Sequence, residues 1–213
     1  MTAFEPIGRI TAVAAPLLRD NVDTDAIIPS REMKSTGKTG LAEGLFAGWR
    51  YAEAGSRVPR PEFVLNQPAY AAAKILLAGR NFGSGSSREH AVWALVEYGI
   101  RAIVAVSFAP IFFGNCIRNG ILPAALPEEA VMEIAAAVSA NPTGCLLTLD
   151  LPRQIVKLPD GRNWPFPIGG EAKAMLLEGL DAIDLTLKHG ESIAAFVAAD
   201  RDARPWIYFG ERR

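Results

Sequence analysis

The sequence predicts an α/β fold, and three observations support this prediction. Two apolar runs, 74–79 and 100–107, have the length and composition of buried strands. Helical patterns follow them at 87–98 and 108–119, and each helical pattern ends at a glycine, where a left-handed residue commonly closes a helix. Strand, helix, strand and helix in this order predict two parallel strands joined by a right-handed crossover.

Further elements precede and follow this centre. Residues 7–14 alternate loosely and predict a strand that ends near Pro16. The later elements are expected to be a helix at 128–140, strands at 146–151 and 154–158, a turn at 159–161 into a third extended segment at 164–168, and helices at 171–180 and 191–200. A small antiparallel element therefore follows the parallel core.

We expect a single domain over residues 1–200 and a C-terminal tail at 201–213. Residues 30–61 are rich in Gly, Lys, Arg and Ser, and they predict a long surface excursion with a helical turn around 41–49. A loop of this length inside a compact domain is usually functional. The large apolar side chains at 204–209 are expected to fold back on the core, with docking on another chain as the alternative.

Composition excludes several classes of protein. The 22 Lys and Arg nearly balance the 23 Asp and Glu, which gives no reason to expect a nucleic acid or an anionic membrane as a partner. The apolar runs are too short to cross a bilayer and the first ten residues lack a signal-peptide pattern, so we expect a cytoplasmic protein. The two cysteines, Cys116 and Cys145, are too few to ligate an iron–sulfur cluster, so any cluster must belong to another chain.

The most informative segment is 81–90, Asn-Phe-Gly-Ser-Gly-Ser-Ser-Arg-Glu-His, between a predicted strand and a predicted helix. Ser86 and Glu89 have the spacing of a capping box, which would place Ser86 at the helix N-cap. The two glycines of the segment allow close approach of the backbone to a ligand. Free amides at a helix start attract anions, and Arg88 adds a planar fork for a carboxylate or phosphate. The segment therefore predicts an anion-binding loop.

Other known loops do not match this segment. A phosphate-binding loop needs Lys before Ser or Thr, and a dinucleotide fingerprint needs Gly where Arg88 stands. A nucleophile elbow at Ser84 would need Gly in place of Phe82. His90 lies four residues after Ser86, but Ser–His pairs are not usually aimed at a substrate along one helix. A purely structural helix cap would use the same residues, and local chemistry alone does not choose between cap and site.

A resemblance to a known family favours an anion-binding site over a purely structural helix cap. Residues 81–93 resemble the signature of the swivelling domain of the aconitase superfamily, 21–29 (Asn-Val-Asp-Thr-Asp-Ala-Ile-Ile-Pro) resemble its N-terminal motif, and 107–115 resemble the segment that follows. Their order and spacing are similar to those of the free-standing small subunits of bacterial isopropylmalate dehydratases, with similarity to about residue 199. The resemblance implies a swivelling β/β/α domain.

The resemblance also implies roles for four residues. Ser86 would be the catalytic base that takes a proton from the carbon next to a carboxylate. Ser87 and Arg88 would bind the substrate carboxylate, and Asp25 would orient its neighbours. A serine hydroxyl is a poor base at its ordinary pKa, so amides and the guanidinium of Arg88 would have to stabilise the alkoxide.

The implied reaction needs a second chain. The resemblance indicates a hydro-lyase that isomerises 2-isopropylmalate to 3-isopropylmalate by dehydration and rehydration, in leucine biosynthesis. The small dicarboxylic acid would lose its hydroxyl to the iron of a [4Fe-4S] cluster on a large-subunit partner. This chain itself is expected to bind no metal or cofactor. Two alternatives are the same chemistry on a related diacid such as citraconate, and a non-catalytic anion-binding module.

Residues 30–45 occupy the place of the family's substrate-specificity loop. Arg31 or Lys34 could reach a distal carboxylate of the substrate, although solvated loop charges are the simpler interpretation. The stretch Arg-Glu-Met-Lys-Ser-Thr-Gly-Lys-Thr-Gly is less apolar than the resemblance implies, which leaves the alkyl group of the substrate open.

A calcium loop is an alternative interpretation of the same region. Asn21, Asp23, Asp25 and Glu32 fall at ligand positions of an EF-hand loop, but Ala26 replaces the required glycine and no helix is expected before the loop. The sequence therefore disfavours calcium.

Overall fold

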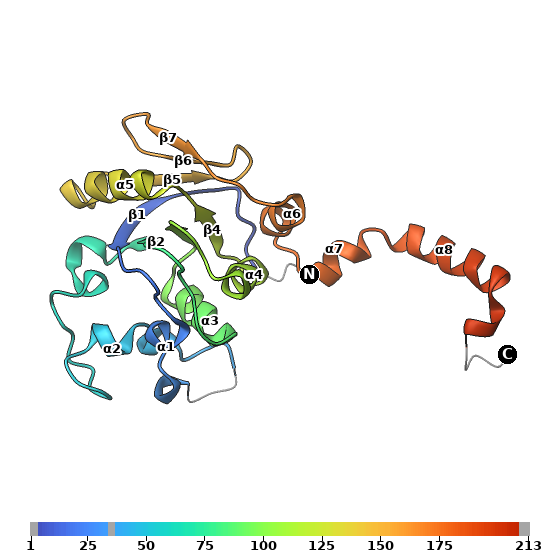
Figure 1. The fold of residues 1–213 in the computed structure, drawn as a ribbon, viewed down its shortest axis with the longest axis horizontal. Coiled ribbons are helices and arrows are strands. Elements are labelled where there is room, and N and C mark those ends of the chain that lie inside the picture. Colours follow the sequence, from blue (N-terminus) through green and yellow to red (C-terminus); the bar gives the residue numbers. More distant parts are fainter. Residues whose placement is uncertain (1–3, 34–36, 209–213) are drawn as a thin grey trace.

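The computed structural model describes residues 4–33 and 37–208. Its centre is one curled seven-stranded sheet with the strand order β4-β3-β2-β1-β5-β6-β7 (Figure 1). The strands are β1 (Arg9–Leu17), β2 (Ala73–Ala78), β3 (Ala102–Ala105), β4 (Leu122–Ala125), β5 (Leu147–Asp150), β6 (Ile155–Lys157) and β7 (Asn163–Pro165). The predicted α/β class is confirmed.

Strand β1 divides the sheet into a parallel and an antiparallel half. It pairs in parallel with β2, and the parallel order continues through β3 to β4. On its other side it pairs antiparallel with β5, followed by β6 and β7. Alternate side chains of β1 enter two different core clusters, Val13 and Leu17 on one face and Ala12 and Ala14 on the other. Burial on both faces explains why this strand is almost entirely apolar.

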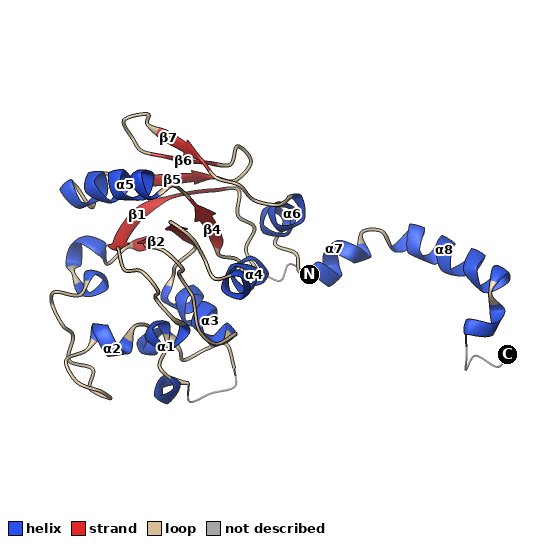
Figure 2. Cartoon of the chain, viewed as in Figure 1, coloured by secondary structure: helices blue, strands red, loops and turns tan. Residues whose placement is uncertain are grey.

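Helices cover both faces of the sheet (Figure 2). They are α1 (Thr24–Ile27), α2 (Ala47–Arg50), α3 (Glu89–Tyr98), α4 (Pro110–Arg118), α5 (Glu128–Ala140), α6 (Gly170–Glu178), α7 (Ala182–Leu187) and α8 (Gly190–Ala203). Side chains of α3 pack in one core cluster, whereas those of α5 and α6 pack in the other, on the opposite face. Within the described ranges, no helix combines the length and apolarity that crossing a bilayer requires.

Helix α1, strand β4 and helix α7 were not predicted. Strand β4 forms an edge of the sheet, where Pro123 is tolerated because only one side of the strand needs backbone hydrogen bonds. Helix α7 begins after Asp181, whose carboxylate accepts a 2.7 Å hydrogen bond from the backbone N–H of Asp184. Strand β1 also continues through Pro16 to Leu17 instead of ending at the proline.

The excursion 30–61 is more than a surface loop. Its predicted helical turn is present as a 3₁₀ turn at Ala42–Gly44 followed by α2. Leu41, Leu45 and Phe46 are completely buried in the same core cluster as α3. The excursion therefore contributes part of the hydrophobic core, which explains why its apolar residues fall in the middle of a polar stretch.

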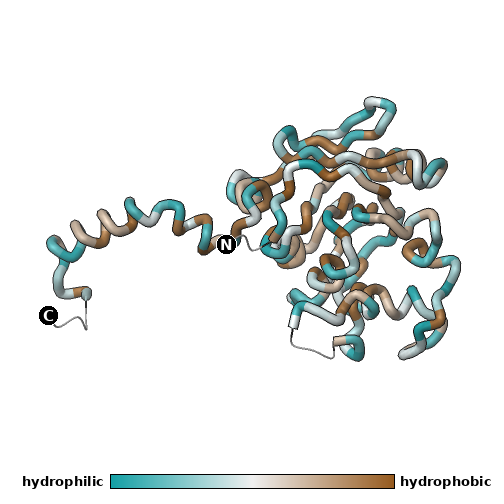
Figure 3. The backbone as a smooth tube through the Cα atoms, turned by 180° about the vertical axis from the view of Figure 1, so that it is seen from behind, coloured by the Kyte–Doolittle hydropathy of each residue, from teal (hydrophilic) through white to brown (hydrophobic). Residues whose placement is uncertain are grey.

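Residues 201–208, the described part of the C-terminal tail, do not fold back on the core, contrary to expectation, and residue 209 lies outside the described residues. Helices α7 and α8 extend away from the sheet as an arm (Figure 1), which carries several apolar positions (Figure 3). No residue of either helix is buried, and the side chains of Phe196 and Trp206 are each 65% exposed. The chain changes direction at Gly179, the left-handed residue that ends α6, and α7 and α8 continue away from the sheet. The alternative, docking on another chain, stays a prediction.

Removing residues 190–213 is expected to leave the stability of the body unchanged, because α8 buries no side chain. We expect the melting temperature of the truncated chain, measured by circular dichroism, to lie within about 2 °C of the full-length value. A fall of more than about 5 °C would show that the arm packs on the body in solution.

Candidate functional site

The site forms where β1, β2 and β3 end. These strands are parallel, so their carboxyl ends meet at one edge of the sheet, the usual place for ligands in α/β proteins. The loop after β2 pairs with the segment after β1. The backbone N–H of Gly83 donates to the carbonyl of Val22 at 2.7 Å, and the N–H of Thr24 donates to the carbonyl of Ser84 at 2.9 Å. The hydroxyl of Thr24 also donates to the carbonyl of Ser86 at 3.1 Å.

The segment after β3 lies on the other side of the same loop. The N–H of Phe82 donates to the carbonyl of Ser107 at 3.0 Å, and the N–H of Ala109 donates to the carbonyl of Phe82 at 2.9 Å. The Ser107 hydroxyl accepts from the N–H of Asn81 at 2.8 Å. The three sequence motifs, separated by tens of residues in the chain, therefore form one continuous backbone arrangement.

Two glycines shape the central loop. Gly83 and Gly85 have φ angles of +78° and +88°, in the region that side chains strongly disfavour. A Cβ atom on Gly83 would also overlap the ring of Phe112, which is only 2% exposed. The loop can therefore keep its path only with glycine at position 83.

The predicted capping box is wrong. Helix α3 begins at Glu89, Arg88 is the N-cap residue, and its side chain makes no capping hydrogen bond. The carbonyl of Ser86 accepts from the N–H of Arg88 at 2.8 Å and from the Thr24 hydroxyl. These tertiary bonds hold Ser86 in a turn before the helix, so its hydroxyl is not used to cap α3.

Asp25 and Arg88 lie together although 63 residues separate them. The Arg88 guanidinium donates to the Asp25 carboxylate and, at 3.2 Å, to the hydroxyl of Ser30. Ser30 donates to the same carboxylate at 3.4 Å. Asp25 itself stands in the first turn of α1, which Asp23 caps through a 2.6 Å bond from the N–H of Ala26.

Sequence reasoning missed Thr24 and Ser30 in this arrangement. Thr24 lies within the aspartate motif 21–29 and Ser30 follows it directly, and this closeness to Asp25 was the available signal. What the sequence lacked was the partner of each hydroxyl.

Ser86 and Ser87 are exposed on the surface of the isolated chain. Across residues 4–33 and 37–208, no group donates a hydrogen bond to the Ser86 hydroxyl, and Arg88 is turned to Asp25 instead. A serine hydroxyl becomes an effective base only where hydrogen-bond donors or a positive charge stabilise its alkoxide. Activation of this hydroxyl therefore requires groups that a ligand or a second chain brings into place.

Of the two candidates in the specificity loop, the structure describes only Arg31. The guanidinium of Arg31 contacts the carboxylate of Glu32 at 3.5 Å rather than the serine loop. Lys34 lies outside the described residues, so its predicted contact with substrate stays a prediction.

The residues present do not fit a metal centre. Across the described ranges, no three His, Cys, Asp or Glu side chains gather closely enough to hold an ion. Burial raises the pKa of the Cys116 thiol, and Cys145 belongs to a different core cluster. The candidate calcium ligands are engaged elsewhere: Asp23 caps a helix and Glu32 pairs with Arg57. An iron–sulfur cluster therefore has no ligand set in the described part of this chain.

Comparison with known proteins indicates one family. Residues 6–129 match the aconitase C-terminal domain. A 3-isopropylmalate dehydratase small subunit from Cupriavidus necator is 59% identical over 206 residues, covering 97% of this chain and 99% of that protein. One from Rhodospirillum centenum is 51% identical, covering 95% and 98%. The crystal structure of a 3-isopropylmalate dehydratase from Methanocaldococcus jannaschii aligns with a TM-score of 0.58 and 27% identity, covering 88% of this chain and 98% of that one.

Proposed function

This chain belongs to the family of aconitase C-terminal domains, and we propose that it is the small subunit of a 3-isopropylmalate dehydratase. The reaction would be the isomerisation of 2-isopropylmalate to 3-isopropylmalate in leucine biosynthesis, in the cytoplasm. The names of relatives from several bacteria favour this activity over citraconate chemistry or a non-catalytic anion-binding role.

The observation that carries the proposal is the convergence of Ser86, Ser87, Arg88 and Asp25 at the carboxyl ends of the parallel strands. A guanidinium suits a carboxylate, which it can bind through two parallel hydrogen bonds, and the exposed hydroxyls of Ser86 and Ser87 directly precede Arg88 in the chain. Arg88 is held by Asp25 in this orientation before substrate arrives, which reduces the entropy lost on binding. The group bound here would then be one carboxylate of a small dicarboxylic acid.

Ser86 would act as the base. It would take a proton from the carbon next to the bound carboxylate, and the resulting negative charge on that carbon would spread onto the carboxylate held by Arg88 and Ser87. Proton removal by a serine needs strong stabilisation of the alkoxide in a site without bulk water. Because Ser86 is exposed in this chain alone, a partner must supply the opposite wall.

We propose that this partner is the large subunit of the dehydratase and that it carries the [4Fe-4S] cluster. The support is chemical: Cys116 is buried in the core and Cys145 lies elsewhere, so the described part of this chain offers no thiolate set. The active site would then be complete only in the complex.

Reconstitution tests the proposed function. The chain is mixed with a cluster-loaded large subunit, and formation of the unsaturated intermediate from 2-isopropylmalate is followed by ultraviolet absorbance. We expect turnover by the complex and none by either subunit alone. A parallel panel with citraconate and other substituted malates identifies the preferred alkyl group. Absence of turnover with every diacid would contradict the proposal.

A further inference from the structure

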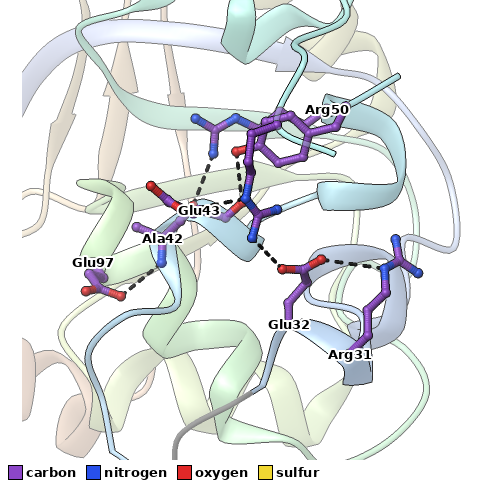
Figure 4. Close-up of polar contacts among 8 residues, drawn as sticks. Arg31, Glu32, Ala42, Glu43, Arg50 and Glu97 are labelled. Carbon is purple, nitrogen blue, oxygen red and sulfur yellow. Dashed lines mark hydrogen bonds and ion pairs between the residues drawn. The ribbon is translucent and has the colours of Figure 1, made fainter. Parts of the chain in front are cut away.

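Glu97 makes an unusual set of contacts at the end of α3. Its carboxylate accepts three backbone N–H groups from the excursion, from Gly40 at 2.7 Å, Leu41 at 2.5 Å and Ala42 at 2.9 Å. Figure 4 shows the carboxylate directed at the backbone of Ala42, where the 3₁₀ turn Ala42–Gly44 begins. The first N–H groups of a helical turn have no partner within the turn, so Glu97 caps this turn from a distant part of the chain.

The charged form of Glu97 is the form that is bound. Desolvation by the overlying excursion acts to raise the pKa of this carboxyl, but the three N–H bonds outweigh it and the pKa of Glu97 is lowered. A lowered pKa means that the stabilisation is present at neutral pH and is lost as the pH falls through the lowered value. At physiological pH the anchor is therefore fully formed.

The anchored limb, residues 40–46, packs directly on the element that carries Asp25. Beyond Ala42, the N–H of Phe46 donates to the carbonyl of Ile27, the last residue of α1, at 2.7 Å. A Cβ atom on Gly44 would meet the side chains of Glu32 and Ile28, so the limb and the segment after α1 are in close contact. A displacement of the limb would therefore be transmitted to α1.

A second carboxylate holds the other side of this contact. The side chain of Glu32 is only 5% exposed and pairs with Arg57 at 2.8 Å. It also contacts the guanidinium of Arg31 at 3.5 Å (Figure 4). Arg57 also reaches Glu43 at 3.5 Å, which links the segment after α1 to the 3₁₀ turn. The limb and α1 therefore form one unit, which is tied to α3 at Glu97.

We propose that Glu97 is a positioning residue for the dehydratase site. Helix α3 starts beside Arg88 and ends at Tyr98, one residue after Glu97, so one rigid element sets the distance between the guanidinium and the anchored limb. Through the limb and α1, Glu97 fixes Asp25 and Ser30 opposite Arg88, and so sets the orientation of the guanidinium that receives the substrate carboxylate. This role rests on the proposed function, although the anchor itself does not.

Hydrogen exchange of the full chain without partner tests the transmission. In Glu97→Gln, one amide oxygen replaces two carboxylate oxygens and the charge is lost. We expect amide exchange to become about threefold to tenfold faster at residues 40–42 and also at 26–28 in and after α1. Glu129→Gln is the matched control, because Glu129 is exposed on α5, across the sheet, and its carboxylate contacts no other described residue. Faster exchange at 40–42 without any change at 26–28 would overturn the positioning role.

Kinetics of the assembled enzyme give the second readout. We expect Glu97→Gln to raise the KM for 2-isopropylmalate about threefold to tenfold while kcat changes less than about twofold, because carboxylate binding and not proton transfer is disturbed. A merely structural role would instead lower the fraction of active enzyme and leave KM unchanged. If the wild-type complex is active and the KM of Glu97→Gln equals the wild-type value, the positioning role is overturned and the proposed function is not affected. An inactive wild-type complex overturns the proposed function, and the exchange experiment then still decides the anchor.

Discussion

Replacing Ser86 by Ala is expected to lower kcat of the assembled dehydratase by about 10² to 10⁴-fold while KM changes little. Removal of a general base costs this factor when water or a neighbour takes the proton less effectively. Arg88 and Asp25 remain in place, so the substrate carboxylate should still bind. Steady-state turnover of 2-isopropylmalate, followed by absorbance of the unsaturated intermediate, measures both constants.

The stability of Ser86→Ala provides a separate check on the same residue. Since the Ser86 hydroxyl does not cap α3, the substitution should not carry the loss of about 1 kcal/mol that removal of an N-cap brings. Ser139→Ala, an exposed serine in α5 on the opposite face, is the matched control for melting and for turnover. If Ser86→Ala keeps more than about a tenth of the wild-type kcat, another group removes the proton.

Replacing Gly83 by Ala is expected to have the largest effect on folding. A φ of +78° costs a residue with a side chain about 1–2 kcal/mol, and forcing Phe112 away adds about 1–3 kcal/mol for overpacking. The ring of Phe112 has little room to move, because it packs edge-on against Phe82 with 5.4 Å between ring centroids. We expect a loss of roughly 2–5 kcal/mol and a fall in melting temperature of roughly 4–20 °C.

Gly169→Ala is the control for this substitution. Gly169 has a φ of −64°, and no atom lies within 4 Å of the position that a Cβ atom would take, so alanine should fit there without strain. Because Gly169 is the N-cap of α6, where alanine is a poorer residue than glycine, we expect a loss of at most about 1 kcal/mol. Equal melting temperatures of the two variants would mean that the loop at Gly83 relaxes easily. The loop would then be a poor framework for a site that depends on the placement of Ser86.

The parallel core could be predicted because its signals are local. Apolar runs with β-branched residues predicted β2 and β3, and Gly99 and Gly120 predicted where α3 and α4 end. Helix α5 has the predicted bounds, Glu128–Ala140. Strand β4 was missed because Pro123 argues against a strand, and only its place at the sheet edge makes that proline acceptable.

The start of α3 shows where local signals fail. Ser86 and Glu89 have the spacing of a capping box, yet the carbonyl of Ser86 is bound by Thr24 and by the N–H of Arg88. A bond to a residue 62 positions away has no trace in the local pattern. The prediction for the tail failed for a similar reason. The apolar character of Trp206 predicts burial but does not indicate the surface against which the side chain would pack.

The sequence alone predicted the α/β class and the order of most elements, and it identified residues 25 and 86–88 as candidate site residues. These predictions were possible because hydrophobic periodicity and short motifs are properties of neighbouring residues. Only the tertiary structure decided that Arg88 faces Asp25 and Ser30, that Ser86 stands in a turn ahead of the helix, and that Glu97 anchors residues 40–42. The contacts of Glu97 with Leu41 and of Arg88 with Asp25 join residues 56 and 63 positions apart. The contact between Arg88 and Asp25 exists because parallel strands bring their carboxyl ends to one edge. The contact of Glu97 lies at the other end of α3, where the excursion packs against the helix.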